Sequence, residues 1–568
     1  MADPNRWQPL QLGPMTRLGR RSLGLIGGLV VSALVGGVLA LVLTRTATPT
    51  TALAPPHFVE ETSTAGVDHV YGGDLKFFAA GGVAVFDCNG DRKPDLYVAG
   101  GSGPAGLFRN ESPVGGSVRF APVHDQATDL TGVNGAYPLD IDGDGQVDLA
   151  VLRVGENVLL RGTGGCRFER ANETWAFNGR TASTTAFSAK WEGSAALPTM
   201  AFGNYVNPAH TDPRRLCDDN ALVRPATSGT GFAPAIPLSP SWCPLSMLFS
   251  DWDRSGRVDL RISNDRHYYR DGDGQEQLWQ VATGQPPRLY TAADGWVPIE
   301  IWGMGIASYD LTGDGYPEVF LTTQGENRLQ TLTTGPSHPT YRDIGLKRGV
   351  NAAQPFTGGD QLPSTAWHPE FQDVNNDGFV DLFISKGNVS AQPDFAQKDP
   401  SNLLLGQPDG TFREGADAAG IVEYAKGRGA ALVDFNLDGL LDLVEVNLGD
   451  RVKLWRNVGA GDATRAAPLG NWLAIDVSQP GPNRNAIGAW IEVRLGDVTQ
   501  RREVTVGGGH VGGQLGPIHF GVGPANEAQV RVQWPDGQVG PWMRVAANQF
   551  ADIARGANEA RPWQPPNS

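Results

Sequence analysis

A ten-residue acidic pattern, D-x-[DN]-x-D-G-x-x-D-L, occurs six times in the middle of the chain. In each copy, oxygen-bearing side chains stand at positions 1, 3, 5 and 9, and glycine stands at position 6 in five of the six. The candidate metal ligands are, copy by copy, Asp87, Asn89, Asp91 and Asp95; Asp140, Asp142, Asp144 and Asp148; Asp251, Asp253, Ser255 and Asp259; Asp310, Thr312, Asp314 and Glu318; Asp373, Asn375, Asp377 and Asp381; and Asp434, Asn436, Asp438 and Asp442.

Oxygen ligands at these offsets suit Ca²⁺, which takes about six to eight carboxylate, carboxamide and carbonyl oxygens. Thiolates and imidazoles are missing from these positions, which disfavours zinc and copper, and Mg²⁺ prefers a more rigid octahedron that retains water. Turn preference of Asp, Asn and Gly is the alternative explanation of any single copy. Six copies with matching offsets favour Ca²⁺ at up to six sites, because unneutralised acids so close together would repel one another.

The six loops are not expected to bind calcium equally. The Asp140 copy is the most acidic, whereas Ser255 and Thr312 each replace a carboxylate in the third and fourth copies. These two loops should be weaker sites. Arg92 stands at position 6 of the first copy, where a positive φ would favour glycine, so the geometry of that loop needs a structural check.

The spacing of the copies predicts the architecture that positions them. Successive copies start 53, 111, 59, 63 and 61 residues apart, so the long interval should contain one further unit. The segment from Lys190 fits the same frame at intervals of 50 and 61 residues, but it has lost its carboxylates. There the Lys190 ammonium group could stand in for the cation. We therefore expect seven units, of which six bind metal.

Each acidic loop joins two apolar strands, and in most units a third strand and a G-x-F turn follow. Four strands per period of 50 to 63 residues are typical of propeller blades, so residues 57–465 are predicted to form a seven-bladed β-propeller. The segment at Phe58 is similar to an outermost strand at Phe412, whereas the last unit lacks one. Residues 58–62 should therefore supply the outer strand of the seventh blade.

Residues 470–552 have the pattern of a second, smaller domain. Apolar and polar side chains alternate between Gly and Pro turns, as at Ile491, Val493 and Leu495, which predicts a small β-sandwich-like fold. Residues 553–568 are expected to be a disordered tail. The predicted fold class is all-β: a seven-bladed propeller followed by this domain and preceded by one N-terminal transmembrane helix.

Several of these motifs resemble known families. The acidic loops and the strand GGVAVFD at residues 81–87 resemble the FG-GAP/VCBS repeats of integrin-like propellers. The motifs NWL at 471–473, IGA at 487–489, HFG at 519–521 and WPDG at 534–537 resemble the ASPIC/UnbV domain. The two domains in this order resemble bacterial relatives of cartilage acidic protein 1. The resemblance implies an extracytoplasmic calcium-binding propeller and no known reaction.

The N-terminal segment predicts a single-pass anchor in the cytoplasmic (inner) membrane. Residues 23–43 are uncharged, and a helix of that length would reach roughly the 30 Å of a hydrocarbon core. Arginines precede them, so residues 1–22 should stay in the cytoplasm and the bulk of the chain should be periplasmic or extracellular. A cleaved signal peptide is the alternative. Small residues at every fourth position of the span could form a homodimer face, and residues 44–56 make a Thr/Pro-rich linker.

The net charge limits the class of binding partner, and the cysteines bear on the redox compartment. The net charge of -15 argues against nucleic acid. Cys217 and Cys243 bracket a Pro-rich insertion, and an oxidising compartment favours a disulfide between them, with buried free thiols as the alternative. Cys88 and Cys166 lie in successive units, and the sequence leaves their pairing open.

The sequence supports two classes of function. It contains no G-x-S-x-G or H-E-x-x-H motif, so no catalytic residue and no organic cofactor site is predicted. We expect an adhesion, interaction or scaffold module that binds a protein or glycan at the cell envelope. A catalytic or accessory role toward a small metabolite or glycan, using the propeller channel, is the alternative. A filled channel would favour the first function, and a pocket with converging titratable groups would favour the second.

Overall fold

The computed structural model describes residues 48–207, 216–265, 274–389 and 396–565. The predicted cytoplasmic segment 1–22 and the predicted membrane span 23–43 lie outside these residues. Among the residues described, no helix is both long enough and apolar enough to cross a membrane.

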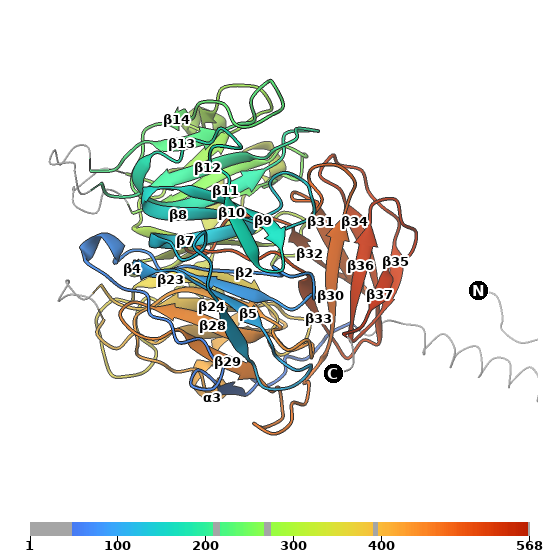
Figure 1. Ribbon diagram of the computed structural model, residues 1–568. Coiled ribbons are helices and arrows are strands. Elements are labelled where there is room, and N and C mark those ends of the chain that lie inside the picture. Colours follow the sequence, from blue (N-terminus) through green and yellow to red (C-terminus); the bar gives the residue numbers. More distant parts are fainter. Residues whose placement is uncertain (1–47, 208–215, 266–273, 390–395, 566–568) are drawn as a thin grey trace, which may run out of the picture. The chain divides into compact units, whose positions relative to one another are not determined.

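Residues 58–457 fold into consecutive sets of four antiparallel strands (Figure 1). Within the described chain, five sets are separate sheets, and two more are joined in a nine-stranded sheet by the pairing of β8 with β11. The first four sets are β2 (Val83–Phe86), β3 (Asp95–Val98), β5 (Gly106–Asn110) and β6 (Phe120–Val123); β7 (Thr131–Leu139), β8 (Asp148–Glu156), β9 (Val158–Gly164) and β10 (Arg167–Arg170); β11 (Thr181–Lys190), β12 (Thr199–Asn204), β13 (Asn220–Val223) and β14 (Ile236–Leu238); and β15 (Pro244–Ser250), β16 (Asp259–Asn264), β17 (Gln277–Gln280) and β18 (Arg288–Leu289).

The last three sets complete this part of the chain. They are β19 (Gly303–Tyr309), β20 (Glu318–Thr323), β21 (Arg328–Leu332) and β22 (Tyr341–Asp343); β23 (Ala366–Gln372), β24 (Asp381–Lys386), β25 (Asn402–Gly406) and β26 (Phe412–Glu414); and β27 (Gly427–Val433), β28 (Asp442–Asn447) and β29 (Lys453–Asn457) with β1 (Phe58–Glu60). Strand β4 (Gly101–Pro104) pairs with β7. The short helices are η1 (Leu75–Phe77), η2 (Ala292–Asp294), η3 (Gly335–Ser337), α2 (Gly345–Arg348) and α3 (Ala416–Ala419).

The first strand of each set is largely buried, and its sequence explains why. All residues of β2 and β15 are buried, as expected of strands that are covered on both faces. First strands of successive sets also contact one another. Apolar runs therefore lie on the inside of a β-propeller-like fold, and the acidic loops follow directly after them.

The outer strand predicted from residues 58–62 is confirmed. Strand β1 pairs antiparallel with β29, with Phe58 opposite Asn457 and Glu60 opposite Trp455. Phe58 is buried in the apolar cluster of the last two sets. The last set thus takes its fourth strand from the beginning of the described chain.

The C-terminal region forms two four-stranded sheets (red in Figure 1). One sheet contains β33 (Ile518–Gly523), β30 (Asn471–Ser478), β36 (Gln549–Ala554) and β37 (Arg561–Trp563); the other contains β32 (Val498–Glu503), β31 (Trp490–Leu495), β34 (Glu527–Gln533) and β35 (Met543–Ala546). Alternate residues of both sheets, such as Ile475 and Val493, share one buried cluster.

The expectation of a disordered tail is wrong for residues 553–565. Strand β37 pairs antiparallel with β36, and Trp563 packs edge-on against Phe550 with ring centroids 5.0 Å apart. Arg92 also lies over the Trp563 ring, 4.7 Å from its centroid. Composition suggested disorder because it cannot detect these two aromatic contacts.

A glycine-rich segment of the C-terminal domain enters the middle of the propeller-like fold. This central segment, residues 505–517, links β32 to β33 and forms backbone bridges to the first strands of five sets. The bridges join Val506 to Ala189, Gly507 to Leu248, Gly509 to Ile306, Gly512 to Ala136 and Gln514 to Val85. The space between the first strands is therefore occupied by the chain itself.

Glycine is required where the first strands approach this segment. A Cβ atom added to Gly82 or to Gly135 would lie 1.8 Å from the backbone oxygen of Val511. No side chain fits at that distance. The insertion was not predicted from the sequence, although the run GGGHVGG at residues 507–513 could have signalled a close backbone approach.

Candidate metal centres

The six acidic loops lie where the first strand of a set turns into the second. In the second set, β7 ends at Leu139 and β8 begins at Asp148, and residues 140–147 make the turn. In all six loops the position-6 backbone N–H donates to the position-1 carboxylate, at N···O distances of 2.7 to 3.1 Å. This hydrogen bond folds the position-1 carboxylate back over its own loop.

Arg92 does not disturb the loop that contains it. At position 6 the φ angle is 66° at Arg92 and 81° to 95° at the five glycines, so all six loops share one left-handed conformation. The Arg92 guanidinium makes two hydrogen bonds to Asp552 of the C-terminal domain, at 3.0 and 2.9 Å. The side chain at this position therefore links the first loop to the C-terminal domain.

The position-9 carboxylate fastens each loop to the sheet. In Asp95, Asp148, Asp381 and Asp442, one oxygen accepts the backbone N–H of position 2 and the other accepts a backbone N–H at or beside the third strand, at 2.7 to 3.1 Å. Asp259 and Glu318 accept comparable hydrogen bonds in the other two loops. This structural role was not predicted from the sequence, because it depends on the neighbouring strand.

Some of the candidate ligand oxygens are buried without a hydrogen-bond donor. Among the described residues, these are the Oδ1 atoms of Asp140, Asp251, Asp310 and Asn436. A buried oxygen that has lost its water and gained no partner is costly, and a cation would satisfy it. In the second loop, carboxylate oxygens of Asp140, Asp142 and Asp148 lie within 4.8 Å of one another. This donor set fits Ca²⁺ better than a softer metal.

Burial raises the pKa of some of the loop carboxylates, most of them at position 9. The pKa of Asp95 is raised to about 7, that of Asp148 to about 8 and that of Glu318 to about 7, because desolvation outweighs the hydrogen bonds that each accepts. Repulsion from neighbouring carboxylates also raises these pKa values. In the fifth and sixth loops the pKa values of Asp381 and Asp442 lie well above the ordinary range. Without a cation, these position-9 carboxylates therefore favour a bound proton.

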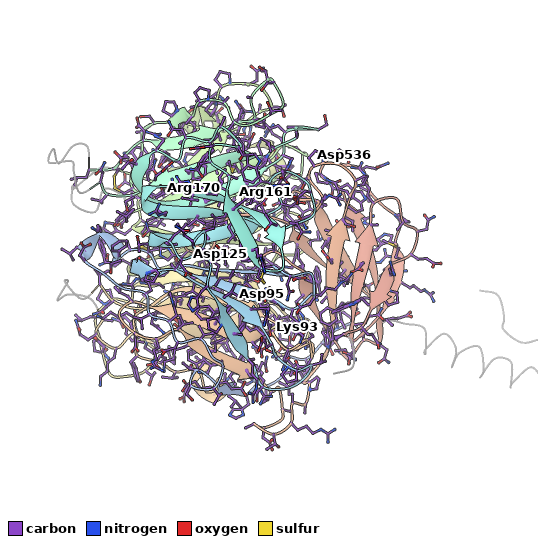
Figure 2. The ribbon with its side chains drawn as sticks, viewed as in Figure 1. Lys93, Asp95, Asp125, Arg161, Arg170 and Asp536 are labelled. Carbon is purple, nitrogen blue, oxygen red and sulfur yellow. A yellow bond between two sulfur atoms is a disulfide. The ribbon has the colours of Figure 1, made fainter. Side chains whose placement is uncertain are left out.

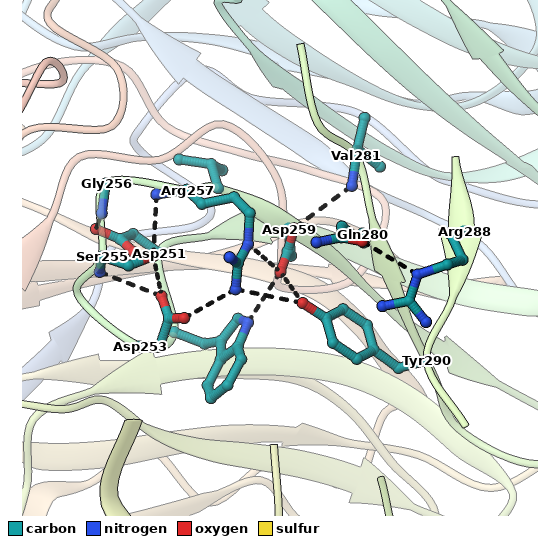
Figure 3. A network of polar contacts seen from close by, with 12 residues as sticks. Asp251, Asp253, Ser255, Gly256, Arg257, Asp259, Gln280, Val281, Arg288 and Tyr290 are labelled. Atoms are coloured by element: carbon teal, nitrogen blue, oxygen red, sulfur yellow. Dashed lines mark hydrogen bonds and ion pairs between the residues drawn. The ribbon is translucent and has the colours of Figure 1, made fainter. Parts of the chain in front are cut away.

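An arginine within the third loop already pairs with its acids (Figure 3). The Arg257 guanidinium lies 2.9 Å from Asp253 through Nη2 and 3.3 Å from Asp259 through Nε. The Tyr290 hydroxyl donates to Asp259 at 2.7 Å, and the Ser255 hydroxyl donates to Asp253 at 2.6 Å. This loop is largely compensated by its own side chains.

Arginines from elsewhere reach the second and fourth loops. Arg161 of β9, labelled in Figure 2, contacts Asp142 at 2.7 Å and Asp144 at 2.8 Å. Arg501 of β32 contacts Asp310 at 2.8 Å. In these loops a cation would share its carboxylates with a guanidinium.

The fifth and sixth loops have no such guanidinium. In the described chain, no lysine or arginine forms an ion pair with Asp373, Asp377 or Asp381 of the fifth loop. Instead the linker covers it, because the Leu53 backbone N–H donates to Asp377 at 2.8 Å. In the sixth loop Asn436 donates to the backbone oxygen of Gly116 at 2.8 Å. The carboxylates of the first loop likewise form no ion pair with a lysine or arginine of the described chain, since Arg92 pairs with Asp552. These three loops therefore keep the least compensated negative charge.

The Lys190 ammonium group bonds to the neighbouring strand set. The Lys190 ammonium donates to the backbone oxygens of Val258, at 2.7 Å, and Val281, both in the next set. Within its own loop, Thr199 donates to Glu192 at 2.9 Å. The ammonium group thus ties two neighbouring sets together and does not neutralise a carboxylate cluster of its own loop.

All four cysteines form disulfides. Cys217 pairs with Cys243, and Cys88 pairs with Cys166. The second bond connects the first acidic loop to the turn that follows β9, so it joins two sets. The sequence had left this pairing open.

Comparison with known families agrees with this arrangement. The FG-GAP-like repeat matches residues 87–151 and 373–445, and the ASPIC and UnbV family matches residues 479–560. The chain contains FG-GAP-like repeats and a C-terminal ASPIC/UnbV domain. The two repeat matches cover the first and second acidic loops and the fifth and sixth. No curated protein matches the sequence.

The solved structures that match this chain are distant in sequence. An Agrocybe aegerita lectin specific for non-reducing terminal N-acetylglucosamine is 16% identical over 67% of this chain and 92% of the lectin, with a TM-score of 0.38. The Trichoderma reesei carbohydrate-active enzyme of family AA12 is 9% identical over 73% of this chain and 99% of its own, with a TM-score of 0.32.

Proposed function

We propose that this chain is a calcium-stabilised interaction or scaffold module of the cell envelope. The observation that carries the proposal is the conformation shared by all six loops, in which buried, hydrogen-bonded carboxylates leave oxygens such as Asp140 Oδ1 and Asp251 Oδ1 without a partner. Ca²⁺ bound there would neutralise the acids and hold the first two strands of a set together.

The six loops should differ in affinity. The fifth and sixth loops rank first, because they lack a competing guanidinium among the described residues and their position-1 and position-9 carboxylates are buried, whereas Asp91 of the first loop is exposed. The third loop ranks last, because Arg257 already pairs with Asp253 and Asp259. In each site the position-1, -3 and -5 side chains would supply the ligands, and the position-9 carboxylate would contribute its remaining lone pairs.

We also propose that the seven strand sets close into a seven-bladed ring, related to the propellers of cartilage acidic protein 1 relatives. Contacts between successive first strands support closure, and so does the pairing of β1 with β29. Pairing of the first strand of the described chain with the last set would hold the two ends of the ring together.

An extracytoplasmic location is part of the same proposal. Two disulfides favour an oxidising compartment. The uncharged stretch 23–43 would anchor the chain in the inner membrane. We also expect a homodimer through that helix. Binding of a protein or glycan partner is favoured over channel catalysis, because the central segment occupies the space between the first strands.

Thermal unfolding of the full chain, with Ca²⁺ or with a chelator, tests this function. We expect a clearly higher Tm with Ca²⁺, because a ligand of the native state stabilises it by about 2.7 kcal/mol per site at 100 times its Kd. Mg²⁺ at the same concentration is the control and should give a smaller shift. Equal melting temperatures with Ca²⁺ and chelator would remove the basis of the proposal.

A further inference from the structure

Residues 48–56, which precede β1, lie directly on the fifth acidic loop. The Leu53 backbone N–H donates to Asp377 Oδ2 at 2.8 Å. The Asn375 side chain donates through Nδ2 to the backbone oxygens of Leu53 and Ala54, at 3.5 and 3.3 Å. This segment, which we call the strap, therefore contacts two of the candidate ligands of that loop.

The strap also contacts the C-terminal domain. The Thr48 hydroxyl donates to the backbone oxygen of Leu495 at 3.5 Å. Pro49 is buried, and a Cβ atom added to Gly378 of the loop or to Gly523 of β33 would lie 2.5 or 3.4 Å from Pro49 Cγ. The strap thus crosses from the domain onto the loop before the chain enters β1.

The loop beneath the strap holds three buried carboxylates and no cation. Asp373, Asp377 and Asp381 are 6%, 1% and 1% exposed, and no lysine or arginine of the described chain forms an ion pair with them. Carboxylates that are dry and uncompensated are costly. A bound cation would neutralise them under the strap, whereas in an empty loop water would compete with the Leu53 N–H for Asp377.

The Asn375 amide can act on both sides at once. Its Oδ1, the candidate ligand atom, accepts the Asp377 backbone N–H at 3.2 Å, while its Nδ2 faces the strap. A cation held by Oδ1 would fix the amide with Nδ2 toward the backbone oxygens of Leu53 and Ala54. The same cation would therefore order both side chains that hold the strap.

The strap has few other attachments to keep it in place. Thr50, Thr51 and Ala54 are exposed, and Leu53 is only half-buried. A segment with so little buried apolar surface opens at a small cost in free energy. We propose that Ca²⁺ in the fifth loop holds the strap on the protein and that loss of the ion releases it. This regulation rests on the proposed calcium function, and a released strap could extend by up to about 30 Å.

Hydrogen–deuterium exchange of the full chain in lipid nanodiscs, read by mass spectrometry, tests the proposal. The Leu53 amide should exchange about tenfold or more slowly with Ca²⁺ than with a chelator, because its acceptor is a charged carboxylate. Strand β1, which follows the strap and pairs with β29, should stay protected in both conditions. Equal exchange at Leu53 in the two conditions, or an equal loss of protection in β1, overturns the proposal.

A substitution in the strap tests the same coupling from the other side. Leu53→Pro removes the N–H that reaches Asp377 and leaves the loop intact, whereas the matched Leu53→Ala keeps that N–H. Coupling between two sites is reciprocal, so in equilibrium dialysis Leu53→Pro should weaken the binding of one Ca²⁺ ion about fivefold or more. Leu53→Ala should bind Ca²⁺ as the wild type does. Unchanged affinities in Leu53→Pro overturn the proposal.

A substitution in the loop separates this proposal from calcium binding itself. Asn375→Asp keeps a ligand oxygen and loses the Nδ2 donor, so with Ca²⁺ the number of bound ions should be kept while Leu53 exchanges about twofold to tenfold faster. Asn526→Asp, the same change at an exposed residue, should alter neither. A wild-type chain that binds no Ca²⁺ overturns both proposals. Bound Ca²⁺ with an unresponsive Leu53 amide overturns the strap proposal alone.

Discussion

At the scale of the residue, each loop position has a separate task. The position-1 carboxylate accepts from position 6, the position-9 carboxylate fastens the loop to the sheet, and position 6 takes a left-handed backbone. The offsets of the oxygen-bearing residues could be read from the sequence, because one pattern recurs. The arginines that pair with the loops could not be identified from the sequence, because Arg161 and Arg501 reach the second and fourth loops from strands outside those loops.

Asp434→Asn should have opposite effects with and without calcium. In chelator, the variant removes a buried, repelled charge, so its Tm should equal or exceed that of the wild type. With Ca²⁺ it should lose about one site's share of stabilisation, on the order of 2 to 3 kcal/mol. Thermal unfolding in both conditions measures this. Asp417→Asn, at an exposed carboxylate outside the loops, is the matched control, and the same response from both variants would contradict the assignment.

The pH dependence of the metal-free protein has a definite sign. The folded-state pKa of Asp140 is raised to about 6 and that of Asp148 to about 8, above the ordinary value of 3.8. Their contribution to stability is therefore complete below about pH 4 and is lost as the pH rises to about 8. We expect the Tm in chelator to fall between pH 5 and pH 8, and the shift caused by Ca²⁺ to grow. A chelator Tm that rises over this range would contradict the buried-carboxylate picture.

At the scale of the element, repetition made the strand sets predictable. The period of the loops indicated four-stranded units, and the similarity of the Phe58 and Phe412 segments located the outer strand that pairs with β29. The tail was mispredicted because β37 depends on Trp563 meeting Phe550 and Arg92, which are distant in sequence. Local composition carries no information on such contacts.

Phe58→Ala should weaken the attachment of β1 to β29. Phe58 is 3% exposed and packs with Leu443 and Trp455, so its removal should cost about 3 to 4 kcal/mol of unfolding free energy. Urea unfolding of the full chain measures this change. Leu346→Ala, at a side chain that is 80% exposed, is the control and should cost less than about 0.5 kcal/mol. Equal costs for the two variants would show that β1 does not hold the last set.

At the scale of the whole molecule, the C-terminal domain and the propeller-like sheets share one interior. The central segment bridges five first strands, and the Arg92–Asp552 and Arg501–Asp310 ion pairs also join the two parts. The order of the two domains could be predicted from their motifs. The insertion of the central segment between the first strands could not be predicted, because a run of glycines in one domain does not indicate which backbone it approaches.

Gly135→Ala should loosen the two domains from each other. The added Cβ would lie 1.8 Å from the Val511 oxygen, so the central segment must shift, at a cost of about 1 to 3 kcal/mol or more. Scanning calorimetry should show one unfolding transition in the wild type and a lower or divided transition in the variant. Gly516→Ala lies in the same segment with open space around it and should change little. Identical traces for both variants would mean that the segment does not couple the domains.

Calcium binding by the acidic loops is tested by counting the bound ions. Equilibrium dialysis of the full chain against ⁴⁵Ca²⁺ at pH 8 should give several bound ions per chain and no more than six, with the fifth and sixth loops filling first. Asp377→Asn combined with Asp438→Asn should then remove the tightest two. A wild-type chain that binds no calcium, or a count that these substitutions leave unchanged, would contradict the account.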